Sequence, residues 1–109
     1  MAEALASYLS GIKNGEELYE KLGMVHPDIR GKVAELTGDI LIKKAEESGD
    51  NIEITKPPKH IEKFRDAFTA SMFATKCYEI ALESYTAKKD TEGIKRIGDT
   101  HVRLGNFKA

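Results

Sequence analysis

The sequence contains a single cysteine, no glutamine and no run of eighteen apolar residues. Because Cys77 is alone, no disulfide can form within the chain, and nothing indicates a disulfide scaffold. Without a long apolar run, no membrane-spanning helix is predicted. Residues 1–12 also lack the basic flank and continuous apolar stretch of a signal peptide, so we expect a cytoplasmic protein.

The sequence also lacks an excess of charge of either sign. Its 18 acidic and 17 basic residues give a formal net charge of −1 at pH 7. Such a balance gives no general attraction to nucleic acid, which we do not expect as a partner. The two halves differ, because residues 1–54 have a net charge of −5 and residues 55–109 one of +4. The absence of glutamine beside abundant lysine and glutamate is typical of proteins from hot environments.

Alternation of apolar and polar residues, the pattern of a β-strand, is almost absent, whereas apolar residues recur every third or fourth position. This spacing predicts an all-α fold with four to five helices in a single domain, residues 1–109. We expect an antiparallel helical bundle or a helix-turn-helix array. The predicted helices cover residues 2–13, 15–22, 27–48, 59–88 and 91–104, and residues 51–59 are predicted to form an extended connector.

Capping and stop residues suggest these boundaries. Asn14 is expected to cap the second helix, and Asp90 or Thr91 the last one. Gly23 and Gly105 are the predicted ends of the second and last helices. Within the first helix, one apolar stripe is predicted, made of Leu5, Tyr8, Leu9 and Ile12.

The predicted helix 59–88 carries two stripes that can both pack against other helices. The bulky stripe consists of Ile61, Phe64, Phe68, Tyr78, Leu82 and Tyr85. The small stripe consists of Ala67, Ala70, Ala74, Cys77 and Ala81. We therefore expect this helix to be central in the fold. Gly31 and Gly38 lie seven residues apart on the preceding helix and are best explained by the close approach of another helix.

The C-terminal third resembles a tetratricopeptide repeat. The residues that carry the resemblance form the pattern Ile94-x-x-Ile97-Gly98-x-x-His101-x-x-Leu104-Gly105-Asn106-Phe107. The resemblance implies that Gly98 lets a partner helix approach, although His101 stands where that family usually has an aromatic ring. The family pattern also requires a further helix after Phe107, so a fragment of a longer repeat protein is one alternative.

Arg96 and His101 resemble the arginine–histidine motif of small all-helical ribonucleases of the HEPN type. The resemblance implies that His101 transfers protons and that Arg96 binds the anionic phosphodiester. Helical periodicity gives another interpretation, a packing role for His101 on the face that also carries Ile94, Ile97 and Leu104. A small ribonuclease or nucleic-acid-binding helical protein is therefore the alternative function.

Metal and phosphate sites have no sequence support. His26, His60 and His101 are far apart in the sequence, and none has a second ligand one helical turn away on the same face. The glycines are scattered and do not form a phosphate-binding loop after a strand. We expect neither a metal nor another cofactor.

The leading hypothesis is a protein–protein interaction or self-association module without catalytic activity. A short chain whose helices are apolar on more than one side has more apolar surface than it can cover by itself. The expected partner is another protein or a second copy, in a homodimer built from residues 59–88 or from the last helix. The predicted partner-binding residues lie on or beside that last helix: Lys88, Lys89, Ile94, Gly98, His101, Arg103 and Phe107.

Overall fold

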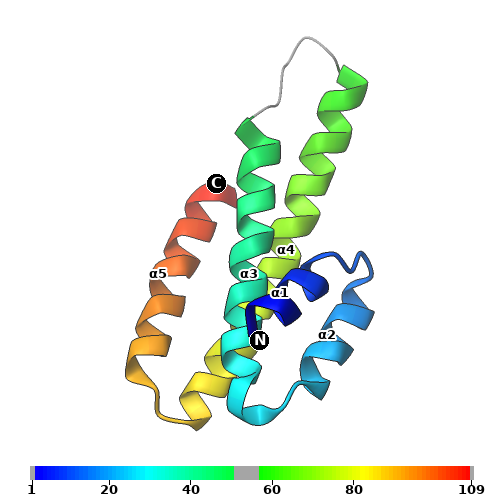
Figure 1. The fold of residues 1–109 in the computed structure, drawn as a ribbon. Helices are drawn as coiled ribbons and strands as arrows, with labels where there is room; N and C mark the ends of the chain where they lie inside the picture. Colours follow the sequence, from blue (N-terminus) through cyan, green and yellow to red (C-terminus); the bar gives the residue numbers. More distant parts are fainter. Residues whose placement is uncertain (1, 51–56, 109) are drawn as a thin grey trace.

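A computed structural model describes residues 2–50 and 57–108, and the side chains of residues 2–44 and 69–100 within them. The described residues form five helices and no strand, which confirms the predicted all-α fold (Figure 1). The helices are α1 (Ala2–Ser10), α2 (Gly15–Met24), α3 (Pro27–Asp50), α4 (Pro57–Ala87) and α5 (Thr91–Lys108).

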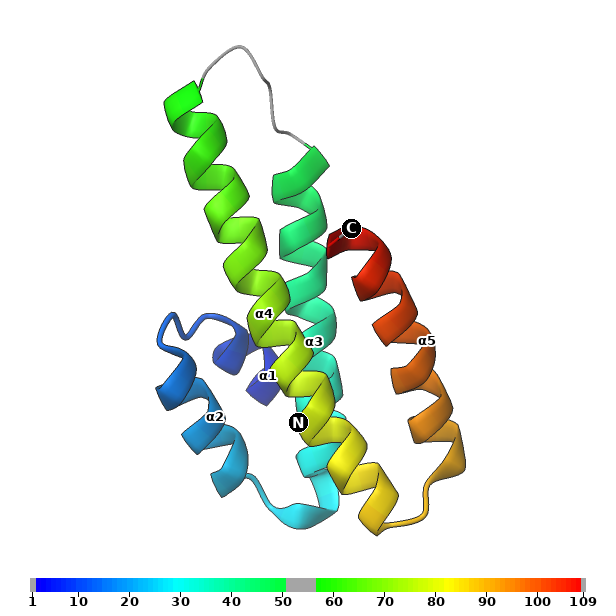
Figure 2. The same ribbon diagram turned by 180° about the vertical axis from the view of Figure 1, so that it is seen from behind.

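An antiparallel pair of long helices, α3 and α4, forms the centre of the fold (Figures 1 and 2). Both views show α1 and α2 on one side of this pair and α5 on the other. The short helix α1 packs mainly on α3, and α5 packs mainly on α4. The surfaces made by α1–α2 and by α5 therefore lie on different sides of the molecule.

Two helix starts were predicted correctly, because the capping side chains bind the amides that have no partner within the helix. The Asn14 side-chain oxygen accepts from the amides of Glu16 (2.9 Å) and Glu17 (3.3 Å). The Asp90 carboxylate accepts from the amide of Gly93 at 3.0 Å. These contacts fix where α2 and α5 begin.

Several predicted ends were wrong. Helix α1 ends at Ser10 and not at residue 13, whereas α2 continues past Gly23 and α5 past Gly105. A glycine inside a helix costs only about 1 kcal/mol relative to alanine, so it does not force an end. Helix α4 begins at Pro57, since proline is tolerated in a first helical turn. The rest of the predicted connector, residues 51–56, lies outside the described residues.

The turn between α4 and α5 contains an unusual backbone conformation. Lys89 has a φ of 57°, a left-handed conformation that usually favours glycine. Next to it, the Asp90 amide donates to the Tyr85 carbonyl at 2.9 Å, and the Lys89 amide donates to Thr86 at 3.1 Å. This hydrogen-bonded end of α4 turns the chain back, so that α5 runs along the central pair.

Two glycines of α3, Gly31 and Gly38, lie against tyrosines of α4. The spacing of these glycines predicted that another helix approaches closely here. A Cβ atom on Gly38 would lie 2.8 Å from Cε1 of Tyr78, and one on Gly31 would lie 2.9 Å from Cε1 of Tyr85. Both tyrosines are buried. The two glycines thus allow the long helices to approach with both rings between them.

Three members of the small stripe of α4, Ala74, Cys77 and Ala81, have no exposed surface, and Ala70 is half-buried. Burial raises the pKa of the Cys77 thiol to about 12, so the thiol stays protonated and acts as a small apolar side chain. The core also receives side chains from the other helices: Leu9, Leu18, Leu22, Val33 and Ile97. The stripe residues of α4 before residue 69 lie outside the described side chains.

Candidate functional site

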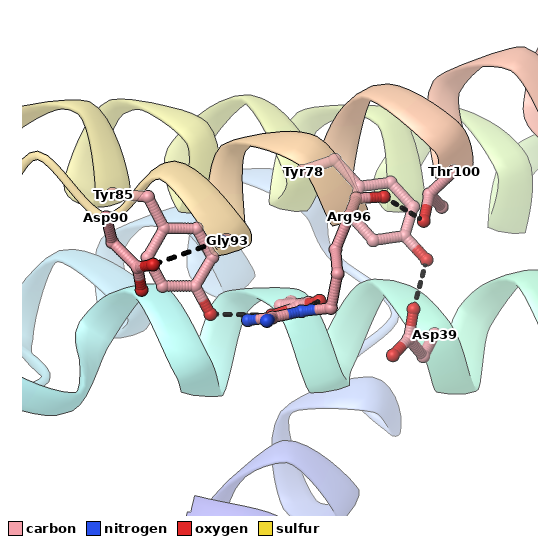
Figure 3. Close-up of polar contacts among 8 residues, drawn as sticks. Asp39, Tyr78, Tyr85, Asp90, Gly93, Arg96 and Thr100 are labelled. Carbon is pink, nitrogen blue, oxygen red and sulfur yellow. Dashed lines mark hydrogen bonds and ion pairs between the residues drawn. The ribbon is translucent and has the colours of Figure 1, made fainter.

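A buried carboxylate joins three helices. Two of its partners, Tyr85 and Arg96, are labelled in Figure 3. Glu35 on α3 accepts two hydrogen bonds from Arg96 on α5, from Nε at 3.0 Å and from Nη2 at 3.1 Å. The hydroxyl of Tyr85 on α4 donates to the same carboxylate at 2.6 Å. Arg96 also lies over the Tyr85 ring, 5.7 Å from its centroid. One carboxylate therefore holds α3, α4 and α5 together.

The burial of this cluster is uneven. The side chain of Glu35 is only 8% exposed, whereas that of Arg96 is 48% exposed. Burial raises the pKa of Glu35, but the hydrogen bonds from Arg96 and Tyr85 more than offset this effect and lower its pKa below the ordinary value. Glu35 is therefore a charged carboxylate at neutral pH, with both oxygens bonded.

A second acid–tyrosine pair lies next to the first along the same helices (Figure 3). The hydroxyl of buried Tyr78 donates to Asp39 at 2.6 Å, one helical turn beyond Glu35. Thr100 on α5 donates to the Arg96 carbonyl at 2.8 Å. The Tyr78–Asp39 hydrogen bond joins α4 to α3, whereas the Thr100 bond lies within α5. Buried polar groups that are fully bonded in this way are typical of a cluster that stabilises the fold.

The hydroxyl of Tyr85 gives this cluster a pH dependence on the alkaline side. Burial, together with its hydrogen bond to Glu35, raises the pKa of Tyr85 to about 12 from an ordinary value near 10. Because the folded-state pKa is the higher one, its stabilising contribution is complete below pH 10 and is lost as the pH rises toward 12. We expect denaturant midpoints to fall more steeply above pH 10 for the wild type than for Tyr85→Phe. Parallel curves would contradict this assignment.

An apolar groove lies on the other side of the molecule, where α1, the end of α2 and the start of α3 meet. Its volume is about 420 Å³, within the range of ligand-binding clefts. The lining residues are mostly apolar: Leu5, Tyr8, Leu9, Lys21, Met24, Val25, His26 and Ile29. Leu9 is buried, while Leu5, Val25 and Ile29 are partly buried against the core. We call this surface the α1–α2 groove.

Large exposed apolar side chains are concentrated here. Of the described side chains, three of this kind are exposed, namely Tyr8 (60%), Met24 (78%) and Met72 (50%). Two of them, Tyr8 and Met24, line the α1–α2 groove. Tyrosine and methionine are both enriched at protein interfaces. The groove therefore combines a partly buried apolar floor with exposed apolar walls.

Lys21 contacts the exposed ring of Tyr8, which forms one wall of the groove. Its Nζ donates to the Tyr8 hydroxyl at 2.9 Å and lies 5.2 Å from the centroid of the Tyr8 ring. It also lies 3.4 Å from the Glu17 carboxylate. The hydrogen bonds to Tyr8 and Glu17 raise the pKa of Lys21, which is thus a cation that holds the exposed ring in place.

The opposite wall is held by the turn between α2 and α3. Arg30 donates to the carbonyl of Gly23 at 2.8 Å and to that of Val25 at 2.9 Å. His26 directly precedes α3, and its Nδ1 accepts from the Asp28 amide at 3.1 Å. These contacts fix the backbone on both sides of Met24, so the groove is a formed feature of the fold.

The predicted partner-binding residues do not form one exposed apolar surface where they are described. Ile94 is partly buried against the core, and the Nζ of Lys88 donates to the Asp28 carbonyl at 2.7 Å. Lys89 is exposed in the turn. Gly98 is exposed, and outside the backbone of its own helix none of the described atoms lies within 4 Å of the place a Cβ would take. The side chains of His101, Arg103 and Phe107 lie outside the described residues.

Little in the sequence indicates the α1–α2 groove. Tyr8 was predicted to lie on the apolar stripe of the first helix, but in the structure most of its side chain is exposed. Met24 and Val25 follow the predicted stop at Gly23 and therefore belonged to no predicted helix. Two consecutive apolar residues between the predicted stop at Gly23 and His26 are the sequence feature that indicates this wall.

Other kinds of site find no support among the described residues. No three of their His, Cys, Asp or Glu side chains are grouped so that they could hold a metal ion. In the same part of the chain, no helix combines the length and apolar character needed to cross a membrane. Comparison with models of protein families, with curated proteins and with solved structures finds no match to this chain.

Proposed function

We propose that this protein is a noncatalytic interaction module that binds the apolar face of a helical protein segment in the α1–α2 groove. The observation that carries the proposal is the grouping of Tyr8 and Met24, both exposed, around one apolar groove of about 420 Å³. Exposed apolar side chains gathered in one place mark interaction sites, whereas single ones do not.

The shape and chemistry of the groove favour a helix as its ligand. A helix presents apolar side chains every third or fourth residue, and such anchors enter grooves of this kind without any special backbone contact. Of the lining residues, Lys21 already bonds to Tyr8 and Glu17, and the His26 Nδ1 already bonds to a backbone amide. Burying the apolar lining residues is therefore the main source of binding free energy.

A synthetic amphipathic peptide tests this proposal directly. The probe is a helix of about 15 residues with leucines at positions i, i+3, i+4 and i+7, and its control has the same composition in scrambled order. We expect saturable binding of the amphipathic peptide by isothermal calorimetry. Met24→Glu places a charge in the groove and should weaken this binding about tenfold or more.

Met72→Glu is the matched control, since Met72 is an exposed methionine on α4 that does not line the groove. It should bind the peptide like the wild type. Equal binding of the scrambled peptide, or equal weakening by both substitutions, would contradict a role for the groove. Circular dichroism of both variants checks that the helices are intact.

The ribonuclease alternative gains no support from the described residues. It requires the Arg96 guanidinium to bind a phosphate, and two donors of that group are already bonded to Glu35. The partner-binding surface predicted on α5 stays a prediction. Over residues 91–100, α5 exposes no large apolar side chain.

A further inference from the structure

We propose that a second cleft, between the end of α4 and the turn from α2 to α3, binds a free aromatic amino acid. The volume of this cleft is about 410 Å³, within the range of ligand-binding clefts. Its lining includes two cations, Arg30 and Lys88, and one acid, Glu83. It shares no lining residue with the α1–α2 groove, so the inference does not rest on the proposed function.

The first argument is that both cations of the cleft lack an acidic partner. Arg30 donates from Nε and Nη2 to the carbonyls of Gly23 and Val25, and the Nζ of Lys88 donates to the carbonyl of Asp28. No described carboxylate forms an ion pair with either cation. The Nη1 of Arg30 makes no hydrogen bond to a described residue, which leaves both of its hydrogens for a ligand. A guanidinium held in this way suits the carboxylate of a ligand.

The second argument is that the acid of the cleft also lacks an ionic partner. Glu83 is exposed on α4, and no cation of the described residues forms an ion pair with it. A carboxylate accepts hydrogen bonds from an ammonium group. A cleft with free charges of both signs matches a ligand that carries both a carboxylate and an ammonium group, as an amino acid does.

The third argument is an apolar wall beside these charges. Tyr19 and Ile80 line the cleft and are half-buried against the core. The ring of Phe73 meets that of Tyr19 edge to face, with centroids 6.2 Å apart, and holds it in place. Pro27 adds a further apolar residue to the lining. Because aromatic rings pack favourably on one another, this wall favours an aromatic side chain on the amino acid.

Three probes that differ by one group test the proposal. L-phenylalanine has both charged groups, 3-phenylpropionate lacks the ammonium group, and 2-phenylethylamine lacks the carboxylate. Each is titrated to millimolar concentration into the ¹⁵N-labelled chain, and the amide NMR signals are followed. We expect L-phenylalanine to give saturable shifts around the cleft, including the amide of Gly23. It should bind about tenfold more tightly than either analogue, since each analogue leaves a charge of the cleft without a partner.

Glu83→Gln removes the acid of the cleft and keeps its size. It should weaken the binding of L-phenylalanine about tenfold without weakening that of 3-phenylpropionate, which has no ammonium group. Glu79→Gln is the matched control, because Glu79 is an exposed glutamate of α4 that pairs with Lys76 and does not line the cleft. This control should bind L-phenylalanine like the wild type, and circular dichroism checks that both variants are folded.

Four results would each overturn the proposal. They are the absence of saturable shifts with L-phenylalanine, shifts confined to parts of the chain away from the cleft, equal binding of the three probes, and equal effects of the two glutamine substitutions.

Discussion

Arg96→Ala is expected to lower the free energy of unfolding by about 2 to 3 kcal/mol. The substitution leaves the Glu35 carboxylate, which is 8% exposed, with one hydrogen bond from Tyr85 in place of three. Removing one partner of a buried pair typically costs about 3 to 5 kcal/mol, and the half-exposed position of Arg96 lets water replace part of the loss. Urea unfolding followed by circular dichroism measures the change, with exposed Lys95→Ala on the same helix as the control.

The same substitution has a characteristic pH dependence. Because the folded-state pKa of Glu35 lies below its ordinary value, the stabilisation from its charged form is present above the ordinary pKa and is lost as the pH falls through the folded-state pKa. The difference in stability between the wild type and Arg96→Ala should therefore shrink in acid. A difference independent of pH would mean that Arg96 acts through packing and not through the charge of Glu35.

Gly38→Ala is expected to lower the free energy of unfolding by up to about 2 kcal/mol, although alanine is the better helix former. The new methyl group would lie 2.8 Å from Cε1 and 2.9 Å from Cζ of Tyr78. Tyr78 is fully buried and its hydroxyl bonds to Asp39, so the ring cannot move aside freely. Overpacking of this kind costs about 1 to 3 kcal/mol, and the helix propensity of alanine returns only about 1 kcal/mol of this loss.

Gly98→Ala is the matched control, because it makes the same chemical change in another long helix. Apart from the neighbouring backbone of α5, no atom of the described residues lies within 4 Å of the added methyl group, and the position is exposed. Here only the helix propensity acts, and stability should rise by about 1 kcal/mol. Equal effects of the two substitutions in urea unfolding would show that the approach of α3 to α4 does not depend on Gly38.

Much of the fold could be predicted, because its causes are local. Asn14 and Asp90 cap helices through amides two or three residues away, and the spacing of apolar residues shows which faces are buried. The glycines of α3 also indicated a close helix contact, since they have no other reason to stand inside a helix. The wrong helix ends follow from how little a single glycine costs a helix that is stabilised by packing.

Neither the polar cluster around Glu35 nor the apolar α1–α2 groove could be predicted. Each depends on contacts between distant parts of the chain. Glu35 and Arg96 lie 61 residues apart in the sequence, and neither one shows from its neighbours that it has a buried partner. Tyr8 has the spacing of a core residue, but α1 packs on α3 through the adjacent Leu9 and leaves the Tyr8 ring exposed beside Lys21. Only the packing of α1 beside the α2–α3 turn creates the groove.

The most direct test of the groove as the binding surface is the NMR signal of the methionine methyl groups. The chain has three methionines, and with ¹³C-labelled methyl groups Met24 reports on the groove while Met72 reports on the exposed surface of α4. As the amphipathic peptide is added, the Met24 signal should shift and saturate, and the Met72 signal should stay in place. A Met24 signal that does not respond while the peptide binds elsewhere would contradict this account.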